Sequence, residues 1–205
     1  TYGGDLGVVF DGDVPSVHLW APTARAVEFH LFGDADPATG ATSFPMSLDP
    51  ATGVWSIEGE SGWVGEYYLF EVEVYVPATG AVENNLVTDP YSLNLSMNSA
   101  RSQIVDLADD ALKPAGWDSY GKPPLAAPED IAIWELHVRD FSASDPSVPD
   151  ELKGTYQAFA LAGGNGRLHL GELASAGLTH VHLLPVFDIA TVNENKSEWM
   201  QPDPA

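Results

Sequence analysis

The sequence predicts an all-β, immunoglobulin-like sandwich over residues 1–115, followed by a strand–helix–strand unit typical of a parallel sheet. Three observations lead to this fold class. Short runs of alternating apolar and polar residues fill the first part of the chain, a Pro-Ala-Thr-Gly tetrapeptide recurs between them, and two apolar runs flank a helical stretch in the last third. The type of structure therefore changes along the chain.

Alternation with a period of two residues identifies the strands of the first part. In the longest run, residues 67–76, the side chains of Tyr68, Phe70 and Val72 fall on one face. Shorter runs of the same kind occupy residues 16–20, 26–32 and 54–57. Several short strands of this kind in one segment favour two packed sheets.

A recurring tetrapeptide marks the turns between several of these strands. The tetrapeptide Pro-Ala-Thr-Gly begins at Pro37, Pro50 and Pro77, each time between two strand-like runs. Proline presets its own φ angle and glycine accepts a positive φ, so each copy is expected to form a turn. The unequal spacing of the three copies excludes a solenoid repeat.

A segment rich in glycine and proline, residues 116–127, is predicted to be a linker. Beyond it, the apolar runs 131–138 and 179–186 are predicted strands, and residues 168–176 fit a short helix closed by Gly177. A strand, a helix and a second strand in this order predict parallel neighbouring strands joined by a right-handed crossover.

Composition narrows the classes of partner. The chain has 30 acidic and 8 basic residues, a net charge of -22, which excludes nucleic acid and an anionic membrane surface as expected partners. A neutral polysaccharide is compatible with this charge, although adaptation for solubility or salt accounts for it equally. The chain has no cysteine, and its first residues do not form a signal peptide, so the signal of an exported protein would lie upstream of Thr1.

Seven segments resemble, in the same order, segments of pullulanase-type starch-debranching enzymes of the α-amylase family. The first resembles the opening of their glycogen-binding-type module, and the last two strands resemble the first strands of their catalytic barrel. Single motifs of this length are weak, whereas the ordered set is specific. The segments are Leu19–Ala24, Gly65–Phe70, Thr88–Ser92, Gly116–Asp118, Ile133–Ser142, Gly154–Phe159 and Gly177–Asp188.

The resemblance implies hydrolysis of α-1,6 branch linkages in pullulan, starch or glycogen, by a carboxylate nucleophile and a carboxylic acid. It places those two residues on later strands, so no catalytic residue is assigned within this chain. It also implies that residues 128–205 are the first part of a TIM-type (β/α)8 barrel, which needs about 250 residues in all. The implied partners are an α-glucan and the remainder of the barrel, and the implied location is extracellular or periplasmic.

Two alternatives stay open at this point. The chain could be a non-catalytic glucan-binding or packing module, or a fragment of an isoamylase or branching enzyme. The segments 134–142 and 183–188 favour a pullulanase over the latter two.

Glu135 and His137 are the polar candidates for the barrel interior. Alternation places both on one face of their strand, opposite Trp134 and Leu136, and barrel sites form where strands end. A structural polar network or an ion pair is the competing interpretation, because buried polar groups usually satisfy one another.

No metal site or cofactor is predicted. His180 and His182 form a His-x-His pair, but no carboxylate-rich motif accompanies them. The acidic pairs at residues 11–13 and 34–36 lack the full ligand set of a calcium loop, so calcium stays open without a motif to support it.

The aromatic residues of the first part raise the question of sugar binding. Modules of this type stack sugars on tryptophans in two loops, but here the corresponding loops, residues 33–37 and 76–80, contain no aromatic residue. Weak or absent binding to soluble glucans is therefore expected, and Trp63, between two glycines, is the best candidate for an exposed ring. Trp20, Trp55 and Tyr68 are expected in the core.

Overall fold

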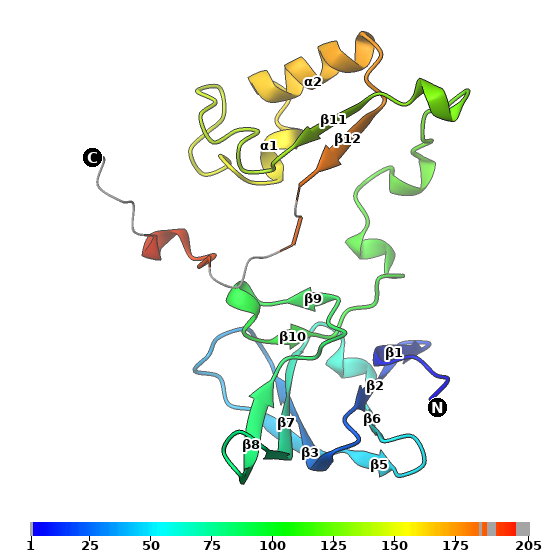
Figure 1. Cartoon of the computed structure of the whole chain (residues 1–205), viewed down its shortest axis with the longest axis vertical. Coiled ribbons are helices and arrows are strands. Elements are labelled where there is room, and N and C mark those ends of the chain that lie inside the picture. The colour runs from blue at the N-terminus through cyan, green and yellow to red at the C-terminus, as the bar shows by residue number, and fades with distance from the viewer. Residues whose placement is uncertain (1, 185, 188–191, 200–205) are drawn as a thin grey trace. The chain divides into compact units, whose positions relative to one another are not determined.

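The computed structural model describes residues 2–184, 186–187 and 192–199. These residues form two compact units (Figure 1). The first, called the sandwich unit, contains residues 2–115 and the segment 192–199; the second, called the parallel-sheet unit, contains the described residues from Gly116 to Phe187. Segment 192–199 therefore groups with the first unit, whereas the boundaries expected from the sequence place it in the second part of the chain.

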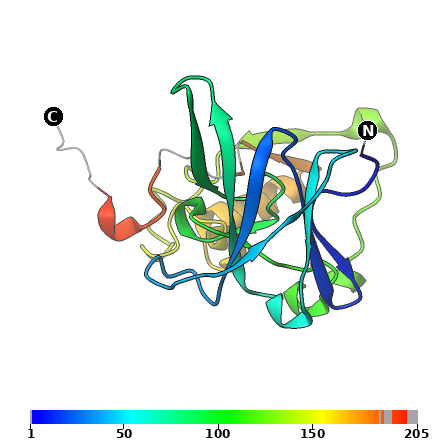
Figure 2. The same ribbon diagram turned by 90° about the horizontal axis from the view of Figure 1, so that it is seen from below.

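The sandwich unit consists of two antiparallel sheets, seen from below in Figure 2. One sheet has the strand order β1-β2-β6-β5, and the other has the order β4-β3-β7-β10-β9, with β8 also paired to β7. The first sheet comprises β1 (Gly7–Asp11), β2 (Val14–Trp20), β5 (Ser47–Asp49) and β6 (Val54–Glu58). The second comprises β3 (Ala24–Phe32), β4 (Thr42–Pro45), β7 (Tyr67–Val76), β8 (Ala81–Val87), β9 (Asn94–Leu95) and β10 (Ser102–Gln103).

Short 3-10 turns complete this unit: η1 (Ser61–Trp63), η2 (Met97–Ser99), η3 (Asp110–Leu112) and η6 (Lys196–Glu198). Asn98 joins η2 to the segment 192–199. Its backbone N–H donates to the Glu194 carboxylate (2.7 Å), and its side-chain oxygen accepts from the Glu194 N–H (2.8 Å). These reciprocal bonds explain why that segment groups with the sandwich unit.

The core lies between the two sheets and is built around aromatic rings. Phe29 of β3 stacks on Tyr68 of β7 with ring centroids 5.2 Å apart, and lies 6.1 Å from Phe70. All three side chains are fully buried. The predicted β-sandwich is confirmed, as is the burial of Trp55 and Tyr68. Burial alternates along β2, whereas in β7 the three consecutive residues 68–70 are all buried.

The prediction that Trp20 is a core residue is wrong, because its side chain is 57% exposed. Val17 and Leu19 of β2 are buried, so the alternation of the strand directs Trp20 to the opposite face, with Ser16 and His18. The size of the ring suggested burial, but the period of the strand decided its direction.

The expectation of an exposed ring at Trp63 is also wrong, because only 8% of this residue is exposed. The turn η1 directs the indole into the core, where it stacks on Phe29 (5.3 Å) and lies against Phe44 (5.1 Å). A Cβ atom at Gly59 would lie 2.5 Å from the indole, so this glycine leaves the space that the ring fills. Trp63 is therefore a core residue whose ring packs against the rings of Phe29 and Phe44.

The parallel-sheet unit contains two paired strands and two helices. Strands β11 (Ile133–Leu136) and β12 (His180–Leu183) are parallel, with Glu135 opposite His182, and helix α2 lies in the connection between them (Figure 1). The predicted parallel pairing is confirmed, although both strands are shorter than the apolar runs. The remaining elements are η4 (Trp117–Ser119), η5 (Pro128–Asp130), α1 (Gln157–Ala160) and α2 (Asn165–Ser175).

Both ends of α2 are stabilised by identifiable hydrogen bonds. At its C-terminus Gly177 adopts φ 111°, and the N–H groups of Gly177 and Leu178 bond back to Ala174 and Leu173, as in a Schellman motif. At its N-terminus the loop before the helix takes the place of a capping residue. Ser147 Oγ accepts from the Asn165 N–H (2.8 Å), and an Asp145 carboxylate oxygen accepts from the Gly166 N–H (3.2 Å).

We expect Asp145→Ala to loosen the first turn of α2. Both oxygens of this carboxylate accept hydrogen bonds from that turn, one from the Asn165 side chain and one from the Gly166 N–H. The Ser147 hydroxyl, as the largest cause, holds the pKa of Asp145 below its usual range. The stability that the ionised Asp145 carboxylate contributes to the fold is therefore present above its unfolded-state pKa and is lost as the pH falls through the lower folded-state pKa. Hydrogen exchange would show faster exchange at residues 165–168, whereas Asp150→Ala, at the exposed pair with Lys153, should leave these amides unchanged.

Candidate functional site

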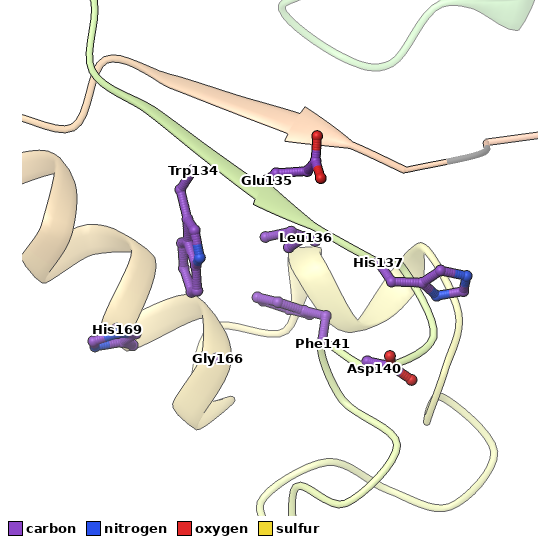
Figure 3. Close-up of a pocket in the computed structure, with 8 residues that line it drawn as sticks. All are labelled: Trp134, Glu135, Leu136, His137, Asp140, Phe141, Gly166 and His169. Atoms are coloured by element: carbon purple, nitrogen blue, oxygen red, sulfur yellow. The ribbon is translucent and has the colours of Figure 1, made fainter.

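A pocket of about 380 Å³ lies at the C-terminal end of β11, within the parallel-sheet unit (Figure 3). Strand β11, the loop that follows it and the first turns of α2 contribute its walls. Parallel sheets form their sites at this end of the strands, because the following loops converge there. The lining residues are Trp134, Glu135, Leu136, His137, Asp140, Phe141, Gly166 and His169.

Aromatic packing shapes the apolar wall of this pocket. Trp134 points from β11 towards α2, where it meets His169 edge to face with centroids 5.7 Å apart (Figure 3). Phe141 stacks on Phe159 of α1 at 3.9 Å. A Cβ atom at Gly166 would lie 2.8 Å from the Phe141 ring, so this glycine lets the loop pack against the start of α2.

The two predicted barrel residues take different roles. Glu135 leaves β11 on the face opposite Trp134, and its carboxylate lies 3.0 Å from Nδ1 of His182 on β12. Both side chains are more than half exposed, so solvent screens this pair and it contributes little to stability. His137 follows the strand and its Nδ1 accepts a hydrogen bond from the Arg139 N–H (3.1 Å). The structure does not bring His137 to Glu135 through any described hydrogen bond.

The chemistry available in this pocket is limited. Its lining contains two carboxylates, Glu135 and Asp140, and each lies beside a basic side chain: Glu135 beside His182, and Asp140 beside Arg139 at 3.8 Å. Within the described ranges of the chain, no group of three or more His, Asp or Glu residues is arranged to hold a metal ion. His180 instead contacts the Thr179 hydroxyl (2.9 Å), while His182 contacts Glu135.

In the sandwich unit, Arg101 holds the loop of residues 33–40. Its side chain is buried, and it donates to the backbone oxygens of Asp34 (2.8 Å) and Thr39 (3.2 Å). The guanidinium also lies 3.7 Å from the centre of the Phe32 ring. No local sequence pattern indicates this role, because only the fold brings Arg101 next to a loop more than 60 residues earlier.

The described helices provide no membrane span, because none is both long and apolar enough to cross a bilayer. The two loops without aromatic residues are well-formed turns, with Gly80 at φ 67° in the second. Neither loop presents a ring on which a sugar could stack. The ring that is exposed on this unit's strand β2 is Trp20.

Residues 5–92, most of the sandwich unit, match the family model of carbohydrate-binding module 48, the isoamylase N-terminal domain. We call this segment, which is similar in sequence to that family, the module. The match begins before β1 and ends after β8, so the module contains strands β1 to β8 and the loop of residues 33–40, whereas β9, β10 and Arg101 follow it.

The module and the unit that follows it match pullulanases together. Pullulanase 1 from the chloroplast of Arabidopsis thaliana is 43% identical over 205 residues, which are 99% of this chain and 21% of that protein. Pullulanase from Klebsiella pneumoniae is 45% identical over 198 residues, 95% of this chain and 18% of that protein. The resemblance to pullulanases is therefore confirmed, and the chain spans about a fifth of the length of these relatives.

A solved structure agrees with both matches. The crystal structure of Klebsiella pneumoniae pullulanase complexed with maltotriose has a TM-score of 0.86 and 41% identity, covering 93% of this chain and 18% of that chain. The coverage includes the module and extends into the parallel-sheet unit. This chain and that pullulanase thus share the same order along the sequence, with the module first and the parallel βαβ unit after it.

Proposed function

We propose that this chain is a non-catalytic part of a glycoside hydrolase that cleaves α-1,6 branch linkages in pullulan, starch or glycogen. The observation that carries the proposal is the 43% identity to a pullulanase over 99% of the chain, across the module and the second unit alike. A module shared among unrelated enzymes would match in its own residues and diverge beyond them. The proposed ligand is an α-glucan, in keeping with the name of the module and with the maltotriose of the Klebsiella complex.

We place β11 and β12 as the first two strands of a TIM-type barrel. Their parallel pairing supports this, as does the direction of the side chains on β11. Leu136 and Val138 are buried on the side of the strand that faces the helices, whereas Ile133, on the other side, is 63% exposed. In a barrel that second side faces the interior, so Glu135 and His137 would lie among inward-pointing residues and the remaining strands would cover Ile133.

The localisation of the protein is proposed to be extracellular or periplasmic. The net charge of -22 and the absence of cysteine are compatible with that environment. The relatives include a chloroplast protein and bacterial ones, so the family works in more than one compartment.

We expect the 205-residue chain to release no reducing sugar from pullulan, because a retaining glycosidase needs two carboxylates flanking the scissile bond. A longer protein that contains this chain and the remainder of the barrel should release maltotriose-sized products from the same substrate. Turnover by the 205-residue chain above the buffer blank would contradict the non-catalytic assignment. Inactivity of the longer protein on pullulan, starch and glycogen would contradict the proposed activity and favour a packing or binding module.

A further inference from the structure

The outer face of the sheet β1-β2-β6-β5 carries an exposed aromatic ring that the core does not use. Trp20 ends β2 with 57% of its surface exposed, although it belongs to a regular strand with two neighbours. Among the described residues, none of the aromatic ring pairs involves Trp20, whereas Trp63 and Phe29 each take part in at least two. The ring therefore contributes little to the packing of the sandwich unit.

The backbone around Trp20 holds the ring in one place. Its indole N–H donates to the Thr52 carbonyl (3.2 Å), and the Ala21 N–H donates to the Gly53 carbonyl (3.1 Å). Gly53 has φ 78°, and a Cβ atom there would lie 2.6 Å from the Cβ of Pro22, so the corner closes tightly only with glycine. With its N–H occupied, the indole presents its apolar ring surface to solvent at little further entropic cost.

Polar groups continue the same face along β2. His18 and Ser16 lie two and four residues before Trp20, so at about 3.4 Å per residue the row extends about 14 Å. Ser16 Oγ lies 3.1 Å from Nε2 of His18, and the Tyr2 hydroxyl lies 3.5 Å from Nδ1 of the same ring. Hydroxyl and imidazole groups both donate and accept hydrogen bonds, which suits the hydroxyls of a sugar.

We propose that this row, Trp20, His18, Ser16 and Tyr2, is an α-glucan-binding surface of the module. A pyranose ring stacks its C–H face on the Trp20 indole, and neighbouring sugars hydrogen-bond to the polar groups along β2. The class of ligand rests on the proposed function, whereas the location of the binding surface rests on the geometry around Trp20. The net charge of -22 favours a neutral ligand over an anionic one.

The loops at residues 33–40 and 76–80 offer no competing aromatic platform. The first is held by Arg101, and both are turns without an aromatic side chain. Two described indoles of the sandwich unit are exposed and hydrogen-bonded at their N–H, Trp20 and Trp199, and of these Trp20 lies on a strand of the module, beside the polar row of β2. Tyr75, 54% exposed on β7, is the matched control, because it lies on the other sheet.

The test is a titration of the 205-residue chain with maltoheptaose, followed by ¹H–¹⁵N correlation spectra up to ~10 mM, since a Kd near ~1 mM corresponds to a weak but measurable complex. We expect the indole N–H signal of Trp20 and the amides of residues 16–20 and 52–53 to shift with one common Kd. Trp20→Phe identifies the indole signal. Maltose and cellobiose, two glucose disaccharides of equal length that differ in the configuration of their linkage, test whether the surface prefers α-linkages.

Trp20→Ala should weaken maltoheptaose binding about tenfold or more, because the stacking surface is removed. Tyr75→Ala should leave the Kd within about twofold of the parent chain. If Trp20→Ala fails to fold, the shifts in the parent chain decide the matter. Shifts confined to other residues, or no shift at all, would overturn the inference, while pullulan hydrolysis by the longer protein would leave the proposed function standing in either case.

Discussion

Replacing Phe29 by Ala is expected to lower the free energy of unfolding of the sandwich unit by about 3–5 kcal/mol. Phe29 is fully buried and lies at the centre of the aromatic cluster, where its ring contacts Trp63, Tyr68 and Phe70. Its removal loses both the transfer free energy of the ring and the packing of three neighbours that cannot all close the cavity. This loss is a large share of the stability of an ordinary domain.

Urea unfolding of the 205-residue chain, followed by tryptophan fluorescence, would measure the effect. Tyr75→Ala removes an aromatic ring of similar size from an exposed position, so its free energy of unfolding should change by less than about 0.5 kcal/mol. Equal losses in the two variants would mean that the cluster around Phe29 does not hold the two sheets together.

Replacing Asp89 by Ala is expected to cost about 2–4 kcal/mol, because its carboxylate is buried and accepts several hydrogen bonds. The Tyr68 hydroxyl donates to one oxygen (2.7 Å) and the Tyr91 N–H donates to the other (2.8 Å). The Asp89 N–H in turn donates to Ser102 Oγ (2.9 Å), which ties the segment after β8 to β10. Alanine would leave the buried Tyr68 hydroxyl and the partly buried Tyr91 N–H without this acceptor.

Asp89→Asn is the matched variant, since the amide oxygen keeps one acceptor and nearly the same volume. It should cost clearly less than Asp89→Ala in the same urea unfolding measurement. Tyr68→Phe removes the donor instead of the acceptor and should fall between the two. If Asp89→Ala were no worse than Asp89→Asn, the hydrogen bonds at this site would contribute nothing to stability.

We also expect the titration of Asp89 to make the free energy of unfolding depend on pH. Burial, as the largest cause, raises the pKa of Asp89, although the Tyr91 N–H and the Tyr68 hydroxyl oppose it. Between the unfolded-state and the higher folded-state pKa, the folded protein binds more protons, so stability decreases as the pH rises through this window. Relative to Asp89→Asn, the parent chain should therefore gain stability when the pH is lowered through the folded-state pKa of this carboxyl group.

Local patterns were enough to predict the strands and their faces. Val17 and Leu19 repeat at every second position, and a sheet has the same period, so the buried side of β2 follows directly. The parallel pairing of β11 and β12 followed for a similar reason, because a helix ended by Gly177 between two apolar runs permits a crossover connection. Trp20 obeys the same rule, because the period of β2 directs its ring to the exposed face despite the size of the ring.

What the sequence determined by itself is therefore the order of the elements, the alternation of their faces and the family that the segments resemble. Only the tertiary structure decided the places of Trp63, Arg101 and Asp89. Trp63 is buried because Gly59 and Phe29 make room for it, and Arg101 holds a loop through two carbonyl oxygens distant in the chain. Such contacts depend on non-local packing, whose partners are brought together by folding and leave no periodic signal in the order of residues.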